Sequence, residues 1–213
     1  MRSAAEFNQF YAVPDPWRIS NARFRDKVLR RVVSKYIPGK SVLELGCGEG
    51  HLTEAIFGDA KSVTGIDLSD IAIERAKARN IPNARFKTAD FLSMSFEGFD
   101  VIAAIECLYY LTPEDQAAFF EKIAREHHGK LLIISGPIIG QTEHRKYFTH
   151  AGLLEMFARY RASLVECRSL NIYRRGAAAN LAAVVVRLPF GDRLLDLLPE
   201  RLIYQRCYII RMM

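Results

Sequence analysis

The stretch VLELGCGEG, residues 42–50, decides the fold of this chain. A mostly apolar run, typical of a buried strand, leads into a turn with glycine at every second position, Gly46, Gly48 and Gly50. Glycine is needed where the backbone adopts a positive φ and where a ligand lies against the chain with no Cβ in the way. With Glu44 two residues before the first glycine, the spacing predicts a strand–turn–helix unit that binds a small ligand.

Two further acidic residues follow later strands at positions that suit such a site. Asp67 ends the second predicted strand about twenty residues after the turn, where a carboxylate meets ribose hydroxyls. Asp90 follows the third strand, and Phe91 beside it can cover an adenine ring while the carboxylate accepts from its amino group. Each acid alone is an ordinary strand-end or loop residue, but the three features together indicate a nucleoside-binding site.

Segments rich in β-branched residues alternate with helical segments along the chain, which is the pattern of a mostly parallel sheet with helices on both faces. Strands are predicted at 41–45, 62–66, 84–88, 99–105 and 131–135. Helices are predicted at 21–36, 51–57, 70–79, 112–126 and 151–160. Two final strands, at 164–173 and 181–188, are close enough in sequence to pair antiparallel.

Composition excludes several classes of protein. Half of the residues are hydrophobic, yet no apolar run reaches the ~18 residues that a membrane span needs. The four cysteines are far apart and form no Cys/His cluster, so we expect reduced thiols, no metal site and a cytoplasmic protein. The net charge of +6 is modest and spread along the chain, so nucleic acid is not the expected partner.

The three motifs resemble those of the Rossmann-like (class I) S-adenosylmethionine-dependent methyltransferases, over roughly residues 21–188. They stand here as ELGCGEG (44–50), GIDLS (65–69) and TADF (88–91). The resemblance implies S-adenosyl-L-methionine as cofactor and S-adenosyl-L-homocysteine as product. The residues that it implies in cofactor binding are Glu44, Gly46, Cys47, Gly48, Gly50, Asp67, Leu68, Asp90, Phe91 and Glu106.

The same resemblance implies an α/β fold: a Rossmann-like seven-stranded sheet with helices on both faces and the last strand antiparallel. We expect an N-terminal lid segment at 1–20, the methyltransferase domain at 21–188 and a C-terminal extension of that domain at 189–213. The extension is basic, aromatic and apolar, so it could make a peripheral membrane contact. The alternative is packing on its own domain or on a second subunit, and we expect a monomer or a homodimer.

A shorter resemblance concerns PDPWR, residues 14–18, which is similar to the Asp-Pro-Trp segment before the core of NodS-like methyltransferases. Those enzymes N-methylate an amino sugar of a chitin-type oligosaccharide. The resemblance implies that Trp17 covers the cofactor and the acceptor. The alternative is a proline-rich turn whose tryptophan anchors the N-terminus on the core.

Methyl transfer requires alignment of nucleophile, methyl and sulfur, exclusion of water and an unprotonated acceptor. We predict His144 as the general base, with Glu106 and His150 as alternatives, because a loop histidine titrates near pH ~6.5. Tyr109 and Tyr110 follow the fourth strand, where they could steer the acceptor and contact a cation or pack in the core.

The loop after the fifth strand supplies further candidate substrate residues. Arg145 and Lys146 could hold a carboxylate or phosphate of the acceptor, and Tyr147 lies beside them. No [Asn/Asp]-Pro-Pro-aromatic motif follows the fourth strand, and no paired Asp/Asn metal ligands follow the fifth. These absences favour a small-molecule or glycan acceptor, methylated at nitrogen or oxygen.

Two rival functions stay open. One is an RNA or protein methyltransferase whose basic helix binds phosphates, a role open to Arg23, Arg25, Lys27, Arg30, Arg31 and Lys35. The other is a methyltransferase-like domain kept as a non-catalytic binding module. The complete cofactor motifs argue against the second, because such a module has no need of them.

Overall fold

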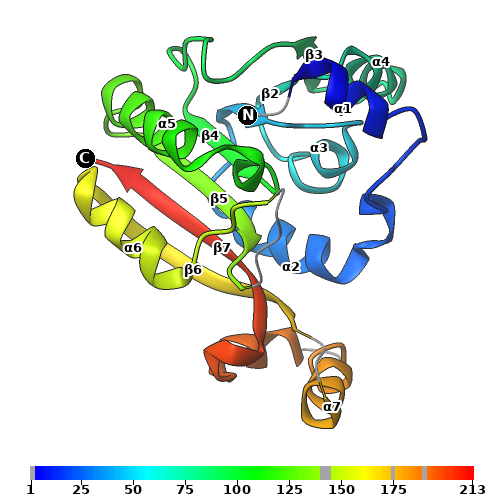
Figure 1. The fold of residues 1–213 in the computed structure, drawn as a ribbon, viewed down its shortest axis with the longest axis vertical. Coiled ribbons are helices and arrows are strands. Elements are labelled where there is room, and N and C mark those ends of the chain that lie inside the picture. Colours follow the sequence, from blue (N-terminus) through cyan, green and yellow to red (C-terminus); the bar gives the residue numbers. More distant parts are fainter. Residues whose placement is uncertain (1–2, 140–144, 174–175, 189–190) are drawn as a thin grey trace.

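The computed structural model describes residues 3–139, 145–173, 176–188 and 191–213. They fold around a seven-stranded sheet with the strand order β3-β2-β1-β4-β5-β7-β6 (Figure 1). The strands are β1 (Ser41–Leu45), β2 (Ser62–Asp67), β3 (Ala84–Thr88), β4 (Val101–Ile105), β5 (Leu131–Pro137), β6 (Ala162–Ile172) and β7 (Ile203–Met212). The first five are parallel, and β7 runs antiparallel to β5 and β6, so the predicted fold class is confirmed.

Helices cover both faces of the sheet. They are α1 (Ala4–Phe10), α2 (Arg23–Val33), α3 (His51–Ile56), α4 (Asp70–Ala78), α5 (Pro113–Glu126), α6 (His150–Arg159) and α7 (Ala177–Val185). Short 3₁₀ turns are η1 (Ile19–Asn21), η2 (Leu108–Tyr110), η3 (Gly191–Leu197) and η4 (Glu200–Leu202). One apolar core joins α2, α3 and α7 to the sheet, and a second joins α5 and α6 to its opposite face. Every residue of β4 is buried, as expected of a central strand covered on both sides.

The strand predicted at 181–188 is wrong, because most of that segment belongs to helix α7. The run Val184–Val186 favours a strand, but the alanines before it are the strongest helix formers. Ala179 and Ala183 pack into the core while Leu181 is 67% exposed. In Figure 1 α7 lies at the bottom of the view, below the sheet.

The last strand comes instead from the segment predicted to be a C-terminal extension. β7 lies between β5 and β6, with Ile209 opposite Ile133 of one and Glu166 of the other. Tyr208, Ile209 and Ile210 are buried, so these residues of the basic and aromatic segment pack in the sheet of their own domain. Among the described residues no helix combines the length and hydropathy that crossing a membrane requires.

The N-terminal segment lies over the carboxyl ends of the parallel strands. Ser3 and Glu6 form a capping box that begins α1, a helix that the sequence analysis did not predict. The Ser69 hydroxyl, next to α4, donates a hydrogen bond of 2.6 Å to Asn8 of α1, and Phe7 meets the ring of Tyr110 edge-on at 5.6 Å. The segment is therefore attached at two places to the edge where an open α/β sheet binds its ligand.

Candidate functional site

A cavity of about 250 Å³ opens at the carboxyl ends of β1, β2 and β4, beneath the N-terminal segment. Eleven of the residues proposed from the sequence line it together: Trp17, Gly46, Cys47, Gly48, Asp67, Leu68, Phe91, Glu106, Tyr109, Tyr110 and Arg145. They come from the N-terminal segment, from turns after four different strands and from the loop beyond β5. The fold thus brings most of the predicted cofactor and substrate residues to one place.

The glycine turn requires glycine at its first two positions. Gly46 and Gly48 have φ of +63° and +53°, which side-chain-bearing residues rarely adopt. A Cβ on Gly46 would lie 2.7 Å from the Cβ of Cys107, and one on Gly48 would lie 2.6 Å from the hydroxyl of Tyr11. The turn therefore presents bare backbone to the cavity, as a closely bound ligand requires.

Asp67 lies directly against this turn. Its carboxylate accepts hydrogen bonds of 2.9 Å from the amides of Gly48 and Ser69, one on each oxygen. Burial raises the pKa of Asp67, and the amide hydrogen bonds oppose the rise. Each oxygen keeps a lone pair, so the carboxylate can also accept from two ribose hydroxyls. With Leu68 and Phe91 as apolar neighbours, these residues fit the nucleoside part of S-adenosylmethionine.

Three predicted cofactor residues do not line the cavity. Glu44 is buried beneath the turn, where its carboxyl group accepts a hydrogen bond from Thr53 and burial raises its pKa to about 8. Gly50 precedes α3 and packs against Arg79. Asp90 accepts a hydrogen bond from the amide of Leu92 in its own loop. Glu44 and Gly50 support the turn from behind, and Asp90 shapes the loop that carries Phe91.

Glu106 lies at the point where β4 ends, in the left-handed region with φ of +58°. Its carboxylate accepts hydrogen bonds from Ser135 of β5 at 3.2 Å, Gln205 of β7 at 3.0 Å and Tyr109 of η2 at 3.4 Å. Burial raises the pKa of Glu106, while the charge of Arg25 and these hydrogen bonds work against the rise. A carboxylate with a raised pKa, fixed by three elements, suits a group that accepts a proton.

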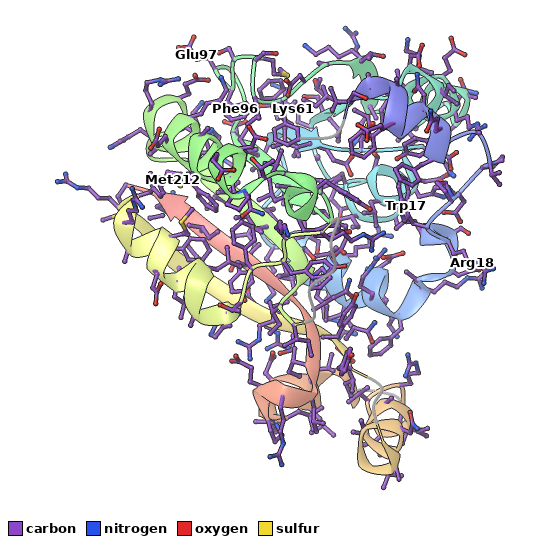
Figure 2. All side chains as sticks on the ribbon, in the orientation of Figure 1. Trp17, Arg18, Lys61, Phe96, Glu97 and Met212 are labelled. Atoms are coloured by element: carbon purple, nitrogen blue, oxygen red, sulfur yellow. The ribbon has the colours of Figure 1, made fainter. Side chains whose placement is uncertain are left out.

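Aromatic rings form the wall between the N-terminal segment and η2. Trp17 meets Tyr11 edge-on at 5.0 Å and lies 6.2 Å from Tyr110. The rings of Tyr109 and Tyr110 are 4.7 Å apart. Figure 2 shows Trp17 in the N-terminal segment, far across the view from Met212 at the end of β7. Tyr109 and Tyr110 both line the cavity. From the sequence alone, packing in the core was the alternative for these two residues.

Among the described residues of the loop after β5, Arg145 lines the cavity. Arg145 lies over the rings of Tyr109 and Tyr110, at 5.7 and 5.3 Å from their centroids. Tyr147 does not line the cavity, but its ring meets Tyr109 edge-on at 5.0 Å and its hydroxyl lies 3.4 Å from the Arg145 guanidinium. Lys146 is exposed and does not line the cavity.

The two histidines proposed as general bases have different outcomes. His144 lies outside the described residues. His150 begins α6 and does not line the cavity, because its ring turns toward β7. There its Nδ1 atom lies 3.0 Å from the hydroxyl of Tyr208. Of the three predicted bases, Glu106 is the one that the described structure places at the cavity.

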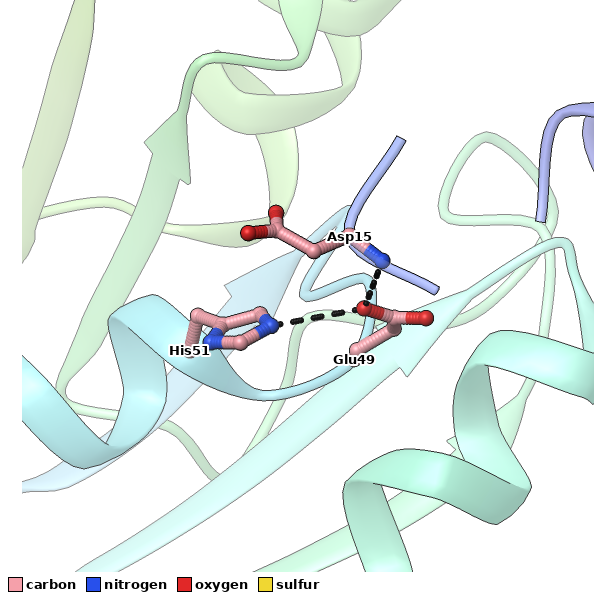
Figure 3. Close-up of side chains that lie close together, drawn as sticks. All are labelled: Asp15, Glu49 and His51. Atoms are coloured by element: carbon pink, nitrogen blue, oxygen red, sulfur yellow. Dashed lines mark hydrogen bonds and ion pairs between the residues drawn. The ribbon is translucent and has the colours of Figure 1, made fainter. Parts of the chain in front are cut away.

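Polar contacts at Glu49 fix the N-terminal segment to the glycine turn (Figure 3). The amide of Asp15 donates a 2.8 Å hydrogen bond to Glu49, and Nε2 of His51 lies 3.3 Å from the same oxygen. Ligand atoms of these three residues lie within 4.8 Å of one another. However, Arg75 binds Glu49 at 2.6 Å and Arg79 lies 2.6 Å from His51, so positive charge opposes a metal ion there.

Several cavity residues were not predicted as site residues. Tyr11 is buried beside Gly48, and Tyr204 belongs to β7, the strand that was not predicted. Gln205 of the same strand does not line the cavity but donates a hydrogen bond to Glu106. Arg25 was assigned to a basic helix face, yet it is 7% exposed, lines the cavity and pairs with Asp26 at 2.7 Å. Its burial was signalled by its position three residues before Val28, on the apolar face of α2.

Intramolecular contacts leave fewer basic side chains of the α2 region available to bind phosphates. Arg25 is buried, Arg31 pairs with Asp192, and Lys35 binds Glu166 at 2.7 Å. Half of the six basic residues are therefore buried or paired with acidic groups.

Comparison with known proteins gives concordant matches. Residues 42–126 match a family described as methyltransferase domain. Nodulation protein S of Sinorhizobium fredii is 31% identical over 179 residues, which cover 79% of this chain and 80% of that protein. Nodulation protein S of Azorhizobium caulinodans is 31% identical over 107 residues, so the chain matches about half (52%) of that relative's length.

Solved structures share the fold. The N-methyltransferase NodS of Bradyrhizobium japonicum WM9, in complex with S-adenosyl-L-homocysteine, superposes with a TM-score of 0.70 at 20% identity. That match covers 98% of this chain and 97% of the other. Magnesium protoporphyrin IX methyltransferase of Synechocystis PCC 6803, with bound S-adenosylmethionine, gives 0.63 at 16% identity, covering 91% and 81% of the two chains.

Proposed function

The chain belongs to the NodS-like class I S-adenosylmethionine-dependent methyltransferases, and we propose that it methylates a nitrogen or oxygen of a small molecule or glycan. The amine of an amino sugar is the first candidate. The observation that carries this proposal is the Glu106 carboxylate, held at the cavity by Ser135, Gln205 and Tyr109.

The geometry of the glycine turn supports our assignment of one half of the cavity to the cofactor. When bound, S-adenosylmethionine supplies a methyl group that its sulfonium makes electrophilic. The bare backbone of Gly46 and Gly48 admits the amino-acid part, and the Asp67 carboxylate accepts from the ribose hydroxyls. Leu68 and Phe91 provide apolar contact for the adenine.

The acceptor half must supply an unprotonated nucleophile. A sugar amine resembles an α-amino group, whose pKa of about 7.7–8.0 leaves much of it protonated at neutral pH. Glu106 accepts the proton, so that the nitrogen lone pair can form the new bond to the methyl carbon while the carbon–sulfur bond breaks. The raised pKa of Glu106 brings its basicity closer to that of the amine.

Aromatic side chains orient the acceptor and exclude water. Trp17, Tyr109 and Tyr110 present flat apolar faces to the cavity. Such faces pack on the C–H side of a sugar ring, and the tyrosines attract a cation. The N-terminal segment, fixed through Asp15 and Glu49, covers the cavity during transfer.

The test combines cofactor binding with methyl transfer. Calorimetric titration with S-adenosyl-L-homocysteine should give saturable one-site binding. Incubation with S-adenosylmethionine and glucosamine oligomers bearing a free amine should then give a product heavier by one methylene, detected by mass spectrometry. Cofactor binding without methylation of these oligomers would refute the amine of an amino sugar as the acceptor.

Glu106→Gln separates proton acceptance from binding. We expect turnover to fall about a hundredfold or more, while affinity for S-adenosyl-L-homocysteine changes less than about threefold. The matched control is Glu97→Gln, an exposed residue that Figure 2 shows at the edge of the molecule, well away from Trp17. Equal turnover in both variants would exclude Glu106 as the base.

A further inference from the structure

Arg145 is held in a fixed position at the acceptor side of the cavity. The amide of the next residue, Lys146, donates a 2.8 Å hydrogen bond to the carbonyl of Tyr109. The buried side chain of Gln116 donates to the carbonyls of Lys146 and Leu108, at 2.9 and 3.2 Å. The backbone that carries Arg145 is therefore joined to η2, the same turn that supplies the two cavity tyrosines.

The guanidinium of Arg145 is stacked on two rings, and the described residues offer it no acidic partner. It lies over the rings of Tyr109 and Tyr110 and meets the hydroxyl of Tyr147. No acidic group of the described chain lies within ion-pair distance of it. Stacking fixes the plane of the guanidinium and leaves N–H donors at its edge, the arrangement that binds an oxyanion through two parallel hydrogen bonds.

The other arginine of the cavity differs in this respect. Arg25 is paired with Asp26 at 2.7 Å, and its charge also acts on Glu106. A half-buried arginine without an acidic partner bears a desolvation cost that an anionic ligand would offset. The asymmetry between the two arginines points to a ligand anion at Arg145.

We infer that Arg145 binds an oxyanion, a carboxylate or a phosphate, on the methyl acceptor. The inference rests on the proposed function and narrows its substrate class to acceptors with both a nucleophile and an anionic group. Tyr109 indicates how far apart the nucleophile and the anionic group of the acceptor lie. Its hydroxyl donates to Glu106, and its ring lies beneath Arg145. Nucleophile and anion are thus bound on either side of one tyrosine, within the size of a compact molecule or a single acidic sugar unit.

The test uses the single tryptophan of the chain, Trp17, which lines the same cavity. Protein saturated with S-adenosyl-L-homocysteine is titrated with inorganic phosphate, with acetate and with tetramethylammonium, and Trp17 fluorescence is followed. We expect saturable binding of at least one anion, weakened about tenfold or more in Arg145→Gln and partly retained in Arg145→Lys. A preference for phosphate indicates a phosphorylated acceptor, and a preference for acetate indicates a carboxylated one.

The matched control is Arg159→Gln. Arg159 is an exposed arginine of α6 that also lies over a tyrosine, 5.5 Å from the ring centroid of Tyr160, but away from the cavity. Anion binding that is equal in the wild type and Arg145→Gln would overturn the inference. So would the absence of anion binding, or saturation by tetramethylammonium instead, which would mark a cation site on the tyrosines. Failure of S-adenosyl-L-homocysteine itself to bind would contradict the proposed function rather than this inference alone.

Discussion

The backbone amide of Gly48 donates a 2.9 Å hydrogen bond to the carboxylate of Asp67 and thereby joins the glycine turn to the end of β2. Asp67 fixes the turn in this way, and we propose that its remaining lone pairs accept from a ribose. We expect Asp67→Ala to weaken S-adenosyl-L-homocysteine binding about a hundredfold, because charge-assisted hydrogen bonds are lost. Calorimetry measures the loss and circular dichroism checks the fold. Asp59→Ala, at an exposed position, is the control, and unchanged affinity in Asp67→Ala would contradict the assignment.

Gly48→Ala tests the contact between the turn and the N-terminal segment. Alanine at φ +53° costs about 1–2 kcal/mol, and its Cβ would lie 2.6 Å from the hydroxyl of Tyr11. We expect Tyr11→Phe to recover about 0.5–1 kcal/mol of that loss, since the clashing oxygen is removed. Urea unfolding of the wild type, both single variants and the double variant measures the coupling. Strict additivity would show that Tyr11 does not press on the turn.

Glu44→Gln should make stability less dependent on pH. Burial raises the pKa of Glu44 from 4.5 to about 8, so the folded state favours the neutral carboxyl group. Its contribution is complete below pH 4.5 and is lost as the pH rises toward 8. Glutamine is neutral at every pH in this range. The free energy of unfolding of the variant should therefore rise relative to that of the wild type as the pH increases, by a few kcal/mol at the upper end. Urea unfolding at several pH values measures the difference, and a gain that shrinks with rising pH would contradict this account.

Ile209→Ala and Leu181→Ala distinguish the observed last strand from the predicted one. Ile209 of β7 is fully buried, so its truncation should cost about 2–4 kcal/mol. Leu181 of α7 is 67% exposed, and its truncation should change stability by less than about 0.5 kcal/mol. Urea unfolding of the two variants compares them directly. The reverse order would mean that residues 181–188 are the core strand.

The part of the fold that the sequence predicted well is the parallel half of the sheet. The predicted bounds of β1 and β3 agree with the structure, and α3 begins at His51 as expected. Each of these elements is specified locally: β1 by an apolar run that ends at glycine, β3 by polar residues that alternate around the buried Phe86, and α3 by the glycine turn before it. The antiparallel half was harder because Val184–Val186 favours a strand locally, whereas burial between β5 and β6 selects Ile203–Met212.

By itself, the sequence determined the glycine turn, the carboxylate of Asp67 and hence the half of the cavity for which we propose nucleoside binding. Those features depend on backbone conformation and on the residue at a strand end, which neighbours in the chain specify. Only the tertiary structure decided the acceptor half. Glu106 and Gln205 are 99 residues apart, and the sheet brings them to 3.0 Å only because β7 lies beside β5. The helical spacing of Arg25 and Val28 places Arg25 on the apolar face of α2, but only the packing of that face against the sheet brings Arg25 to the cavity.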